Sequence, residues 1–504
     1  MARSIIVRLV GSIIALLALT GCGEQSASPP RGPSVSAGAS RPAARASAPS
    51  ILRDVMPRAG AGQTGHIGQA GRPATAAVDA PKTTASVGAV GRADVCLDGS
   101  GHLGRLFEGL ARLEAGHGTD DVRIMQYGDS HTASDSGTSV FRRALQARFG
   151  DGGRGFVSLG KPWKTYWQEG LRGGMSAGFD PFKVQFKSGT YYGVDGCYGL
   201  LGVGVAASKE GERAWAEVQA VTSRLEVDYW QWPSGGSFDL SIDGARVGHV
   251  ATKAQQAGSG YVAFEVAERP HQVELRTGGD GEVRVFGMVL DRAQAGVVVD
   301  ALGINGAQVF TPLRWNEEHF VEQLRRRAPD LVIVAYGTNE SLESKLSDEE
   351  YERGIVDFLG RIARAVPTAS CLLLGPPDRA MYTSGPEGWA SAPRIVEIVS
   401  MQRRVAAAAG CAFYDQLQAM GGPGSMAAWA AEPEPRGFKD RMHLTRTGYA
   451  QLATSFADEL LRAYDAWRVQ RGSSVEHSQE KINAPGAVAT PQTPAESRRS
   501  TSLR

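Results

Sequence analysis

Apolar runs of strand length alternate with amphipathic helical segments along much of this 504-residue chain, and this alternation constrains the fold more than any other feature. The predicted strands are residues 122–127, 297–302, 331–336, 371–374 and 411–414. The predicted helices are residues 139–149, 320–327, 349–366 and 394–409, followed by a final helix with one face formed by Tyr449, Leu452, Phe456, Leu460 and Tyr464. Apolar strands that alternate with helices pair in parallel and are covered on both faces. The sequence therefore predicts an α/β domain around a parallel sheet.

One stretch between residues 156 and 296 breaks this rhythm, because its apolar residues recur at every second position. Phe238, Leu240 and Ile242 alternate with polar residues, and the next two residues, Asp243-Gly244, are a hairpin turn signal. This pattern predicts an all-β module inserted between the first helix and the second strand of the α/β domain.

The first residues have the features of an export signal. Arg3 and Arg8 accompany the apolar residues 9–19, a stretch too short to cross a bilayer comfortably. Leu19-Thr20-Gly21-Cys22 resembles a bacterial lipobox, in which Cys22 is lipidated and becomes the mature N-terminus. The alternative is an ordinary secretory signal with a chance cysteine, but the small residues directly before Cys22 favour lipidation.

We therefore expect an exported lipoprotein that is held to a membrane by lipid on Cys22. Gly23 follows Cys22. In enterobacterial sorting, an aspartate at this position would favour the inner membrane. By that resemblance we expect the outer membrane, with the protein facing the periplasm or the cell surface.

Composition divides the rest of the chain. Residues 25–92 are rich in Ala, Ser, Pro and Gly without apolar periodicity, which predicts a disordered tether. The predicted divisions are a signal peptide at 1–21, a tether at 22–92, an α/β domain at 93–157 and 296–470, an inserted β-sandwich at 158–295, and a disordered tail at 471–504.

The net charge and the cysteine pattern limit the partners and cofactors that the chain is expected to have. A net charge of +1 gives no electrostatic footprint for nucleic acid, so no nucleic-acid partner is expected. No HExxH or paired CxxC spacing is present, so no metal or other cofactor is expected. Beyond Cys22, the cysteines are Cys96, Cys197, Cys371 and Cys411. An exported protein could pair them in three ways, but the last two lie in apolar strands, which favours buried free thiols.

Ser130 is the candidate nucleophile, because it follows a buried strand and precedes a helix. Ligands bind at the carboxyl ends of strands in an open parallel sheet, and the N–H groups of a helix start favour developing negative charge. Serine needs a base to take its proton. His131 is adjacent, but neighbouring side chains leave a strand end in different directions, so we do not expect it to reach Ser130.

His443 is the better candidate base. It lies just before the final helix, for which Thr445 is a plausible N-cap. Asp440, three residues earlier, is close enough to accept the other imidazole N–H and to fix the tautomer. Ser130, Asp440 and His443 would then fill the roles of a catalytic triad.

Two further strand ends supply candidate oxyanion donors. Gly306 follows the second strand, where glycine permits close backbone approach. Asn339 follows the third strand and could donate its side-chain amide. We expect the backbone N–H groups of Ser130 and Gly306, together with the Asn339 amide, to form an oxyanion hole.

These residues carry a family resemblance. Gly128-Asp129-Ser130, Gly306, Gly337-Thr338-Asn339-Glu340 and Asp440-x-x-His443 resemble the four ordered blocks of the SGNH (GDSL-type) hydrolases. Each block alone arises easily by chance, but four in order at strand ends and helix starts are specific. The resemblance implies a flavodoxin-like three-layer α/β/α fold and metal-free ester hydrolysis, over residues 95–156 and 296–470.

Two departures narrow the resemblance. Glu340 replaces the usual aspartate of the third block, and the β insertion widens the gap between the first two blocks. The run GDSHTASD, with Arg142-x-x-Leu145-Gln146 and Phe149-Gly150-Asp151-Gly152-Gly153, resembles the bacterial peptidoglycan O-acetylesterases. Those enzymes carry a carbohydrate-module-like β-domain at this point, and the Gly-Thr-Asn-Glu of the third block resembles theirs.

Other patterns in the chain also resemble functional motifs. Gly174-Met175-Ser176-Ala177-Gly178 matches a nucleophile elbow, but it lacks the buried strand before it and the helix pattern after it. Gly202-x-Gly204-x-x-Ala207 mimics a dinucleotide fingerprint without the βαβ context. The aromatic residues of the insertion, Trp163, Tyr166, Trp167, Tyr229, Trp230 and Trp232, could stack on sugars, although such residues more often form core.

The sequence thus predicts a lipoprotein esterase that removes O-acetyl groups from an acetylated glycan, most directly peptidoglycan, through an acetyl-enzyme on Ser130. Two alternatives stay open. One is an O-acetyltransferase with the same triad, in which a sugar hydroxyl replaces water. The other is a non-catalytic glycan-binding lipoprotein with an inert α/β domain.

Overall fold

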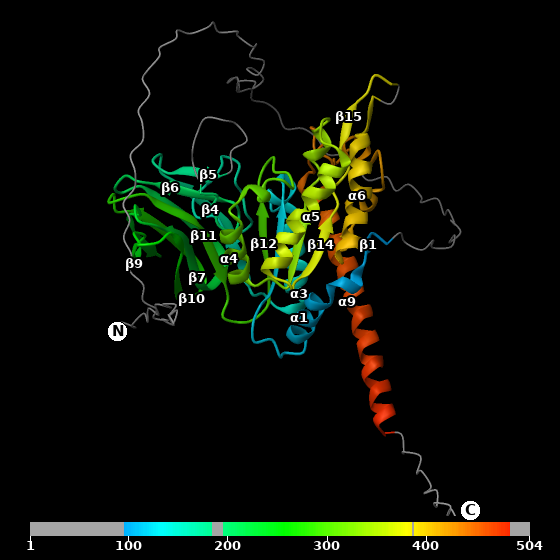
Figure 1. Cartoon of the computed structure of the whole chain (residues 1–504), viewed down its shortest axis with the longest axis horizontal. Helices are drawn as coiled ribbons and strands as arrows, with labels where there is room; N and C mark the ends of the chain where they lie inside the picture. Colours follow the sequence, from blue (N-terminus) through cyan, green and yellow to red (C-terminus); the bar gives the residue numbers. More distant parts are fainter. Residues whose placement is uncertain (1–94, 184–194, 386–387, 484–504) are drawn as a thin grey trace, which may run out of the picture. The chain divides into compact units, whose positions relative to one another are not determined.

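The computed structural model of the protein describes residues 95–183, 195–385 and 388–483 (Figure 1). The predicted signal peptide, the lipidation site Cys22, the tether at 22–92 and the tail beyond residue 483 lie outside the described residues. None of the helices within the described ranges has the length and apolarity needed to cross a membrane.

A six-stranded sheet forms the centre of the α/β domain. Its strands are β1 (Leu97–Asp98), β2 (Val122–Gly128), β12 (Val297–Gly303), β13 (Leu331–Ala335), β14 (Ser370–Leu374) and β17 (Ala412–Tyr414). They lie in the order β1-β17-β14-β13-β2-β12, and all neighbours are parallel except β1, which pairs antiparallel with β17. Counted along the chain, the parallel strands follow the order 2-1-3-4-5 of the flavodoxin-like fold. The predicted fold is confirmed.

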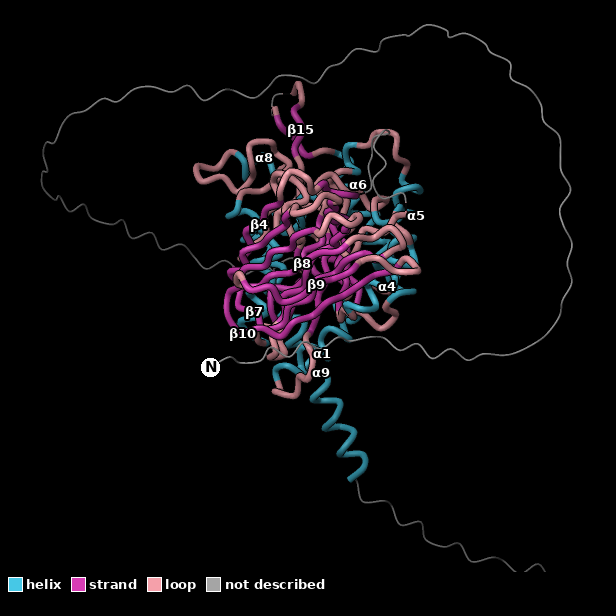
Figure 2. The backbone as a smooth tube through the Cα atoms, turned by 90° about the vertical axis from the view of Figure 1, so that its left-hand side faces the viewer, coloured by secondary structure: helices cyan, strands magenta, loops and turns pink. Residues whose placement is uncertain are grey.

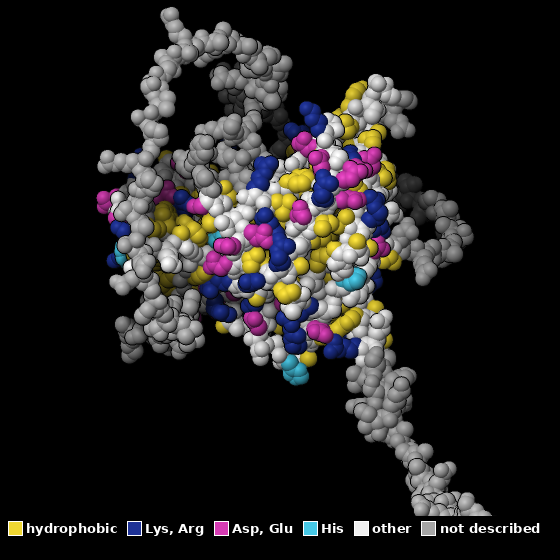
Figure 3. All heavy atoms as spheres, viewed as in Figure 1, with side chains coloured by type: hydrophobic (Ala, Val, Ile, Leu, Met, Phe, Trp, Pro, Cys, Tyr) yellow, Lys and Arg dark blue, Asp and Glu magenta, His cyan; other side chains and the backbone are white. Residues whose placement is uncertain are grey.

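Helices cover both faces of this sheet. One face packs against α1 (Gly104–Glu114), α3 (Ser136–Phe149) and α9 (Arg446–Asn483). The other face packs against α4 (Glu317–Arg327), α5 (Asp348–Ala365) and α6 (Pro393–Ala409). Three shorter helices are α2 (Ser130–Ala133), α7 (Gln416–Met420) and α8 (Ser425–Ala430), and β15 (Ala380–Tyr382) and β16 (Trp389–Ser391) form a separate hairpin. Charged side chains of both signs are interspersed over the helical face seen in Figure 3, and the two signs nearly balance in the whole sequence.

The period of the sequence explains this packing. On α9 the residues spaced for one helical face are buried, and Phe456 stacks on Phe141 of α3 with ring centroids 4.7 Å apart. Each buried aromatic or aliphatic side chain contributes about 1.5–3 kcal/mol to folding. The hydrogen bond that the Thr445 hydroxyl accepts from the N–H of Gly448, at 3.3 Å, confirms the predicted cap of α9.

The inserted module is a nine-stranded antiparallel assembly (Figure 2). Its strands are β3 (Gly153–Val157), β4 (Leu171–Met175), β5 (Asp180–Lys183), β6 (Val203–Ala207), β7 (Arg213–Gln231), β8 (Ser237–Ile242), β9 (Ala245–Ala251), β10 (Gly258–Thr277) and β11 (Val283–Asp291). The long strands β7 and β10 pair along their whole length. The first half of β7 also pairs with β4 and its second half with β11, so these two strands pass from one layer of the module to the other.

A buried ion cluster joins the module to the parallel sheet. Asp300 of β12 accepts the N–H of Phe156 at 2.7 Å and the Nε of Arg327 at 2.8 Å. Arg327 also donates to Asp291 of β11 at 2.9 Å. Burial disfavours the Arg327 cation, but Asp291 and Asp300 outweigh it and raise its pKa well above the usual value. Separating the module from the parallel sheet would leave these buried charges unpaired, and an unpaired buried charge costs several kcal/mol. The cluster therefore holds the module and the sheet together.

Three expectations need correction. The module begins at Gly153 rather than at the predicted residue 158, because β3 pairs with β11 and not with the parallel sheet. Helix α9 continues to Asn483, so the prediction of an unstructured chain from residue 471 is wrong for 471–483. Extending an existing helix costs far less than starting one, so polar residues can prolong it.

The third correction concerns the cysteines. Cys371 and Cys411 form a disulfide, whereas free thiols were the favoured expectation. Cys371 lies in β14, and Cys411 directly precedes β17, the neighbouring parallel strand. Their Cα atoms are 4.8 Å apart, and residues 40 positions apart in sequence meet there only because of the sheet order. Cys96 and Cys197 are buried and take no part in this disulfide.

Candidate active site

Ser130 is the first residue of α2, directly after β2. Asp129 caps this helix by accepting the N–H of His131 at 2.9 Å. Gly128 lets the chain turn at this point, since a Cβ there would lie 2.2 Å from the Thr132 hydroxyl and 2.8 Å from the carbonyl of Ala335. The serine therefore lies at the carboxyl end of the central strand, where the strand order reverses and ligands bind in such sheets.

The structure brings Ser130, His443 and Asp440 together. The Oγ of Ser130 lies 2.8 Å from Nε2 of His443, and Nδ1 of that imidazole lies 2.7 Å from a carboxylate oxygen of Asp440. A carboxylate on Nδ1 keeps that proton in place and leaves Nε2 free to accept the serine proton. The three residues thus have the geometry of an activated serine nucleophile.

The loop before α9 holds the histidine and its carboxylate in register. The other oxygen of Asp440 accepts the backbone N–H groups of Met442 and His443, each at 3.0 Å. The carbonyl of His443 accepts the N–H of Phe438 at 2.8 Å. Partial burial raises the pKa of Asp440, but its hydrogen bonds to His443 and to the loop outweigh this, so the net pKa is lowered. Asp440 is therefore ionised at neutral pH.

The two predicted oxyanion donors other than Ser130 lie on the flanking loops. Gly306, after β12, has φ +75°, a left-handed conformation that favours glycine. Asn339, after β13, donates its side-chain amide to the carbonyl of Ala307 at 2.8 Å, which leaves a second amide proton. Within the described residues, the backbone N–H groups of Ser130 and Gly306 donate to no other acceptor.

Glu340 ties these two flanking loops together. One carboxyl oxygen accepts the N–H of Val309 at 2.7 Å and the other accepts the N–H of Gly337 at 3.0 Å. The side chain is fully buried, and burial raises its pKa to about 7 despite these two donors. In the sequence, Glu340 stands out only because it replaces the usual aspartate of the third block. Its extra methylene is consistent with this reach from one loop to the next.

His131 does not act on Ser130, as expected from its position. Its Nδ1 lies 2.9 Å from the Tyr449 hydroxyl on α9, and its ring centroid lies 5.2 Å from that of His443. Burial, and then the neighbouring His443, lower the pKa of His131 to about 3. The imidazole is therefore neutral and supports the His443 ring by packing. The role of Tyr449 was not found from sequence, where it counted only as a core residue of the last helix.

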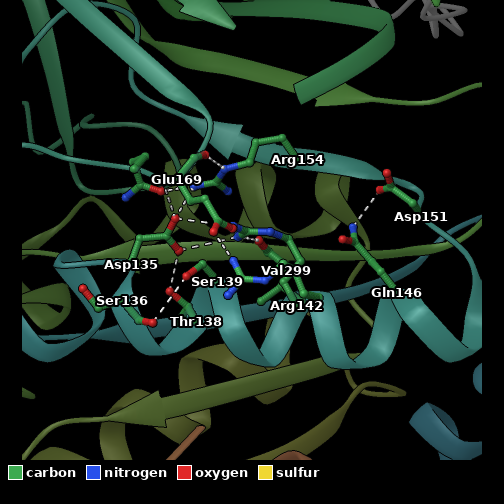
Figure 4. A network of polar contacts seen from close by, with 12 residues as sticks. Asp135, Ser136, Thr138, Ser139, Arg142, Gln146, Asp151, Arg154, Glu169 and Val299 are labelled. Atoms are coloured by element: carbon green, nitrogen blue, oxygen red, sulfur yellow. Dashed lines mark hydrogen bonds and ion pairs between the residues drawn. The ribbon is translucent and has the colours of Figure 1, made fainter. Parts of the chain in front are cut away.

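A buried charged cluster around Asp135, five positions after Ser130 in the sequence, fixes the start of α3 (Figure 4). Asp135 is fully buried, has φ +50°, and accepts from Arg154 at 2.8 Å and from the Thr138 hydroxyl at 2.5 Å. It also forms an ion pair with Arg142 at 3.4 Å. Burial raises the pKa of Asp135, but the two guanidinium groups outweigh it, so the net pKa is lowered.

This cluster joins the α/β domain to the inserted module. Asp135 accepts the N–H of Glu169, and Glu169 forms ion pairs with arginines of α3. Gln146 bonds the Asp151 carboxylate at 2.8 Å and the Val297 carbonyl at 2.9 Å. The residues that carried the resemblance after Ser130 are therefore structural links between helix α3, the module and the sheet.

The module also contacts the loop of Gly306 and the start of α9, close to His443. Thr165 lies 3.5 Å from the side-chain amide of Asn305, the neighbour of Gly306. Trp167 is 39% exposed, and the Arg446 guanidinium lies 5.4 Å from its ring centroid, three residues after His443. By contrast, Tyr229 and Trp230 are buried in core. The aromatic residues of the module thus divide into core residues and an exposed tryptophan beside the site.

The competing motifs do not form sites. Ser176 follows β4 and bonds the Glu212 carboxylate, with no helix after it. Gly202 precedes β6, an antiparallel strand of the module, and not a βαβ unit. No group of three or more acidic, histidine or cysteine side chains within the described residues could hold a metal ion.

Comparisons with known proteins bear on this site. The model of the GDSL-like lipase/acylhydrolase family matches residues 260–451. A solved peptidoglycan O-acetylesterase is 25% identical, with a TM-score of 0.61, over 74% of this chain and 99% of that protein. A family two carbohydrate esterase from Clostridium thermocellum with cellohexaose is 12% identical, with a TM-score of 0.23, over 51% of this chain and 94% of that protein. No curated protein sequence matches the chain.

Proposed function

We propose that this chain, an SGNH (GDSL-type) hydrolase and therefore an esterase, acts on a cell-envelope polysaccharide. It removes O-acetyl groups from this polysaccharide, and peptidoglycan is the expected substrate. The observation that carries the proposal is the hydrogen-bonded chain from Ser130 through His443 to Asp440. The similarity to the peptidoglycan O-acetylesterase covers 99% of that protein and 74% of this chain, a share of this chain larger than the α/β domain alone.

The chemistry follows from this geometry. Nε2 of His443 takes the hydroxyl proton of Ser130 as Oγ attacks the acetyl carbonyl carbon. The resulting imidazolium is stabilised by Asp440, and it protonates the sugar oxygen as the C–O bond to the acetyl group breaks. The acetyl group remains on Ser130. His443 then takes a proton from water, whose oxygen attacks the acetyl carbon, and acetate leaves as Ser130 regains its proton.

Three donors would hold the carbonyl oxygen when it becomes negative. They are the backbone N–H groups of Ser130 and Gly306 and the remaining amide proton of Asn339. Their positions at three neighbouring strand ends support this role, and fixed donors of this kind lower the barrier because they need no reorganisation. Glu340 keeps the loops of Gly306 and Asn339 at a set separation.

The inserted module would contribute to glycan binding. Its exposed Trp167 lies beside Arg446, close to the catalytic histidine, and an indole face can stack on a sugar ring. Lipid on Cys22 would hold the enzyme at the outer membrane, where the tether would let it reach the envelope polysaccharide. Palmitate labelling and detergent partition of the wild type and Cys22→Ala would test this anchor. Equal labelling of both would refute it.

Purified protein and its Ser130→Ala variant would be compared on p-nitrophenyl acetate and on O-acetylated peptidoglycan, with free acetate measured. We expect Ser130-dependent release from both. No release above that of the variant would refute the esterase and favour a glycan-binding protein. Acetylated peptidoglycan would also be incubated with an unacetylated acceptor glycan. Acetyl groups that move to the acceptor, in place of free acetate, would indicate a transferase.

A further inference from the structure

Arg379 is a half-buried cation that the catalytic scheme does not use. It lies between β14 and β15, and its Nη1 donates to the hydroxyl of Ser341 at 3.2 Å. That serine follows Asn339 by two residues and bonds back to the carbonyl of Thr338 at 2.6 Å. The guanidinium therefore contacts the loop that carries the candidate oxyanion donor.

The backbone next to Arg379 contacts the other catalytic loop. The N–H of Ala380 donates to the carbonyl of Arg441 at 2.9 Å, and Arg441 lies between Asp440 and His443. Arg379 is thus placed between the loop of the oxyanion donor and the loop of the catalytic base.

The charge on Arg379 has no acidic partner. Among the residues that the structure describes, no carboxylate forms an ion pair with it, and burial alone lowers its pKa. Arg394, at the start of α6, shows the ordinary case: burial disfavours its cation, but Asp348 and Glu397 outweigh it and raise the pKa. A guanidinium stays protonated in proteins, so Arg379 carries a positive charge that nothing in the described chain neutralises.

Arg441 adds a second such cation. Its guanidinium carbon lies 4.0 Å from the ring centroid of Trp389 in β16, and its Nη1 lies 3.4 Å from the carbonyl of Lys439. Its Nε is buried without a hydrogen-bond partner within the described residues. The Arg441 cation therefore packs on the β15–β16 hairpin, and Arg379 is the cation that contacts the loop of Asn339.

We propose that Arg379 is an anion subsite of the active site, which binds a carboxylate carried by the acetylated sugar substrate. This inference rests on the proposed esterase function and names its substrate class. A planar guanidinium recognises a carboxylate with two parallel hydrogen bonds, which gives direction as well as charge. The carboxylate could belong to the sugar residue itself or to a peptide attached to it.

Three acetylated substrates would distinguish these sources. The first is 6-O-acetyl-N-acetylmuramic acid, which has a free lactyl carboxylate. The second carries on that carboxyl a short peptide that ends in a carboxylate, and the third is 6-O-acetyl-N-acetylglucosamine, which has neither. Initial rates of acetate release would give kcat and KM for the wild type, for Arg379→Met, and for Arg172→Met, a matched control on the exposed strand β4.

We expect the wild type to prefer one or both carboxylate substrates over the neutral sugar. Arg379→Met should lower kcat/KM for the preferred substrate by about tenfold to a hundredfold, mainly through KM, as expected for a lost hydrogen bond to a charged group. Its kcat/KM on the neutral sugar should stay within about twofold, which also shows that the variant folds. Arg379→Lys should lose less, and Arg172→Met should keep the wild-type preference.

Equal losses on all three substrates would overturn the subsite, because they would indicate a structural role for Arg379. An unchanged preference in Arg379→Met would overturn it as well. If the first substrate alone shows the preference, the sugar carboxylate is the ligand, and if the second alone does, the peptide carboxylate is. Failure of the esterase proposal is separate: the wild type would then release no more acetate than Ser130→Ala from any of the three.

Discussion

The side-chain amide of Asn339 donates to the backbone carbonyl of Ala307 at 2.8 Å, across the two loops that flank the candidate nucleophile. One of the two amide protons of Asn339 is thereby used in a structural hydrogen bond. The same bond fixes the direction in which the remaining amide proton points. Asn339→Ala should lower kcat for ester hydrolysis by about 10²–10³-fold with a small change in KM. Steady-state kinetics would check this, with Gln308→Ala, next to Ala307 on the neighbouring loop, as the control. A wild-type kcat in Asn339→Ala would remove Asn339 from the oxyanion hole.

Asp440→Asn should lower kcat by about 10²–10⁴-fold, because an amide in place of the carboxylate no longer stabilises the imidazolium and can favour the wrong tautomer. The Asp440 side chain is 42% exposed, and solvent shares in stabilising the imidazolium, so the loss should lie toward the lower end. An asparagine oxygen can still accept the two loop N–H groups, which keeps the loop in place. Kinetics on p-nitrophenyl acetate would measure the effect, and a loss below threefold would show that His443 does not depend on Asp440.

Asp135→Asn should lower the free energy of unfolding by about 3–5 kcal/mol, because it leaves Arg142 and Arg154 without their shared buried carboxylate. Glu169→Gln is the matched control, since the Glu169 side chain is 37% exposed and its pairs are worth about 1 kcal/mol or less. Urea unfolding of both variants would compare them. Similar losses in the two would mean that the cluster shown in Figure 4 does not depend on its buried member.

His131 should make stability fall as the pH is lowered. Its pKa is about 3 in the folded protein against 6.5 unfolded, so the unfolded state binds a proton that the folded state refuses. The contribution is fully present above pH 6.5 and is lost progressively as the pH falls toward 3. Between pH 7 and pH 4.5 the wild type should lose about 2–3 kcal/mol more stability than His131→Asn, which cannot titrate. Urea unfolding at both pH values would measure it, and equal losses would mean that His131 titrates normally.

The Cys371–Cys411 disulfide closes a loop of 40 residues. Removing it in Cys371→Ser/Cys411→Ser should lower the free energy of unfolding by about 3–4 kcal/mol, chiefly because the unfolded chain gains freedom. Thiol labelling under denaturing conditions, followed by mass spectrometry, would check the pairing. Labels on these two cysteines in unreduced protein would contradict it, whereas labels on Cys96 and Cys197 are expected.

Local patterns were sufficient for much of the fold. The strand at 122–127 and the helix of Phe456 could be predicted because apolar period depends on neighbours along the chain, and burial follows it. The boundary at residue 153 and the end of α9 could not be predicted so well. A short strand can join either of two sheets, and a polar helix end has no period to mark it.

The sequence by itself determined which chemistry the chain carries: a serine at a strand end, a histidine before a helix, and an aspartate one turn away from that histidine. Only the tertiary structure decided how these groups are supported. The distances from Ser130 to His443, the link of Glu340 between two loops, the disulfide, and Arg379 between the catalytic loops all join residues far apart in the chain. Such contacts depend on the order of strands in the sheet, which is fixed by the packing of the whole domain and leaves no local signal in the sequence.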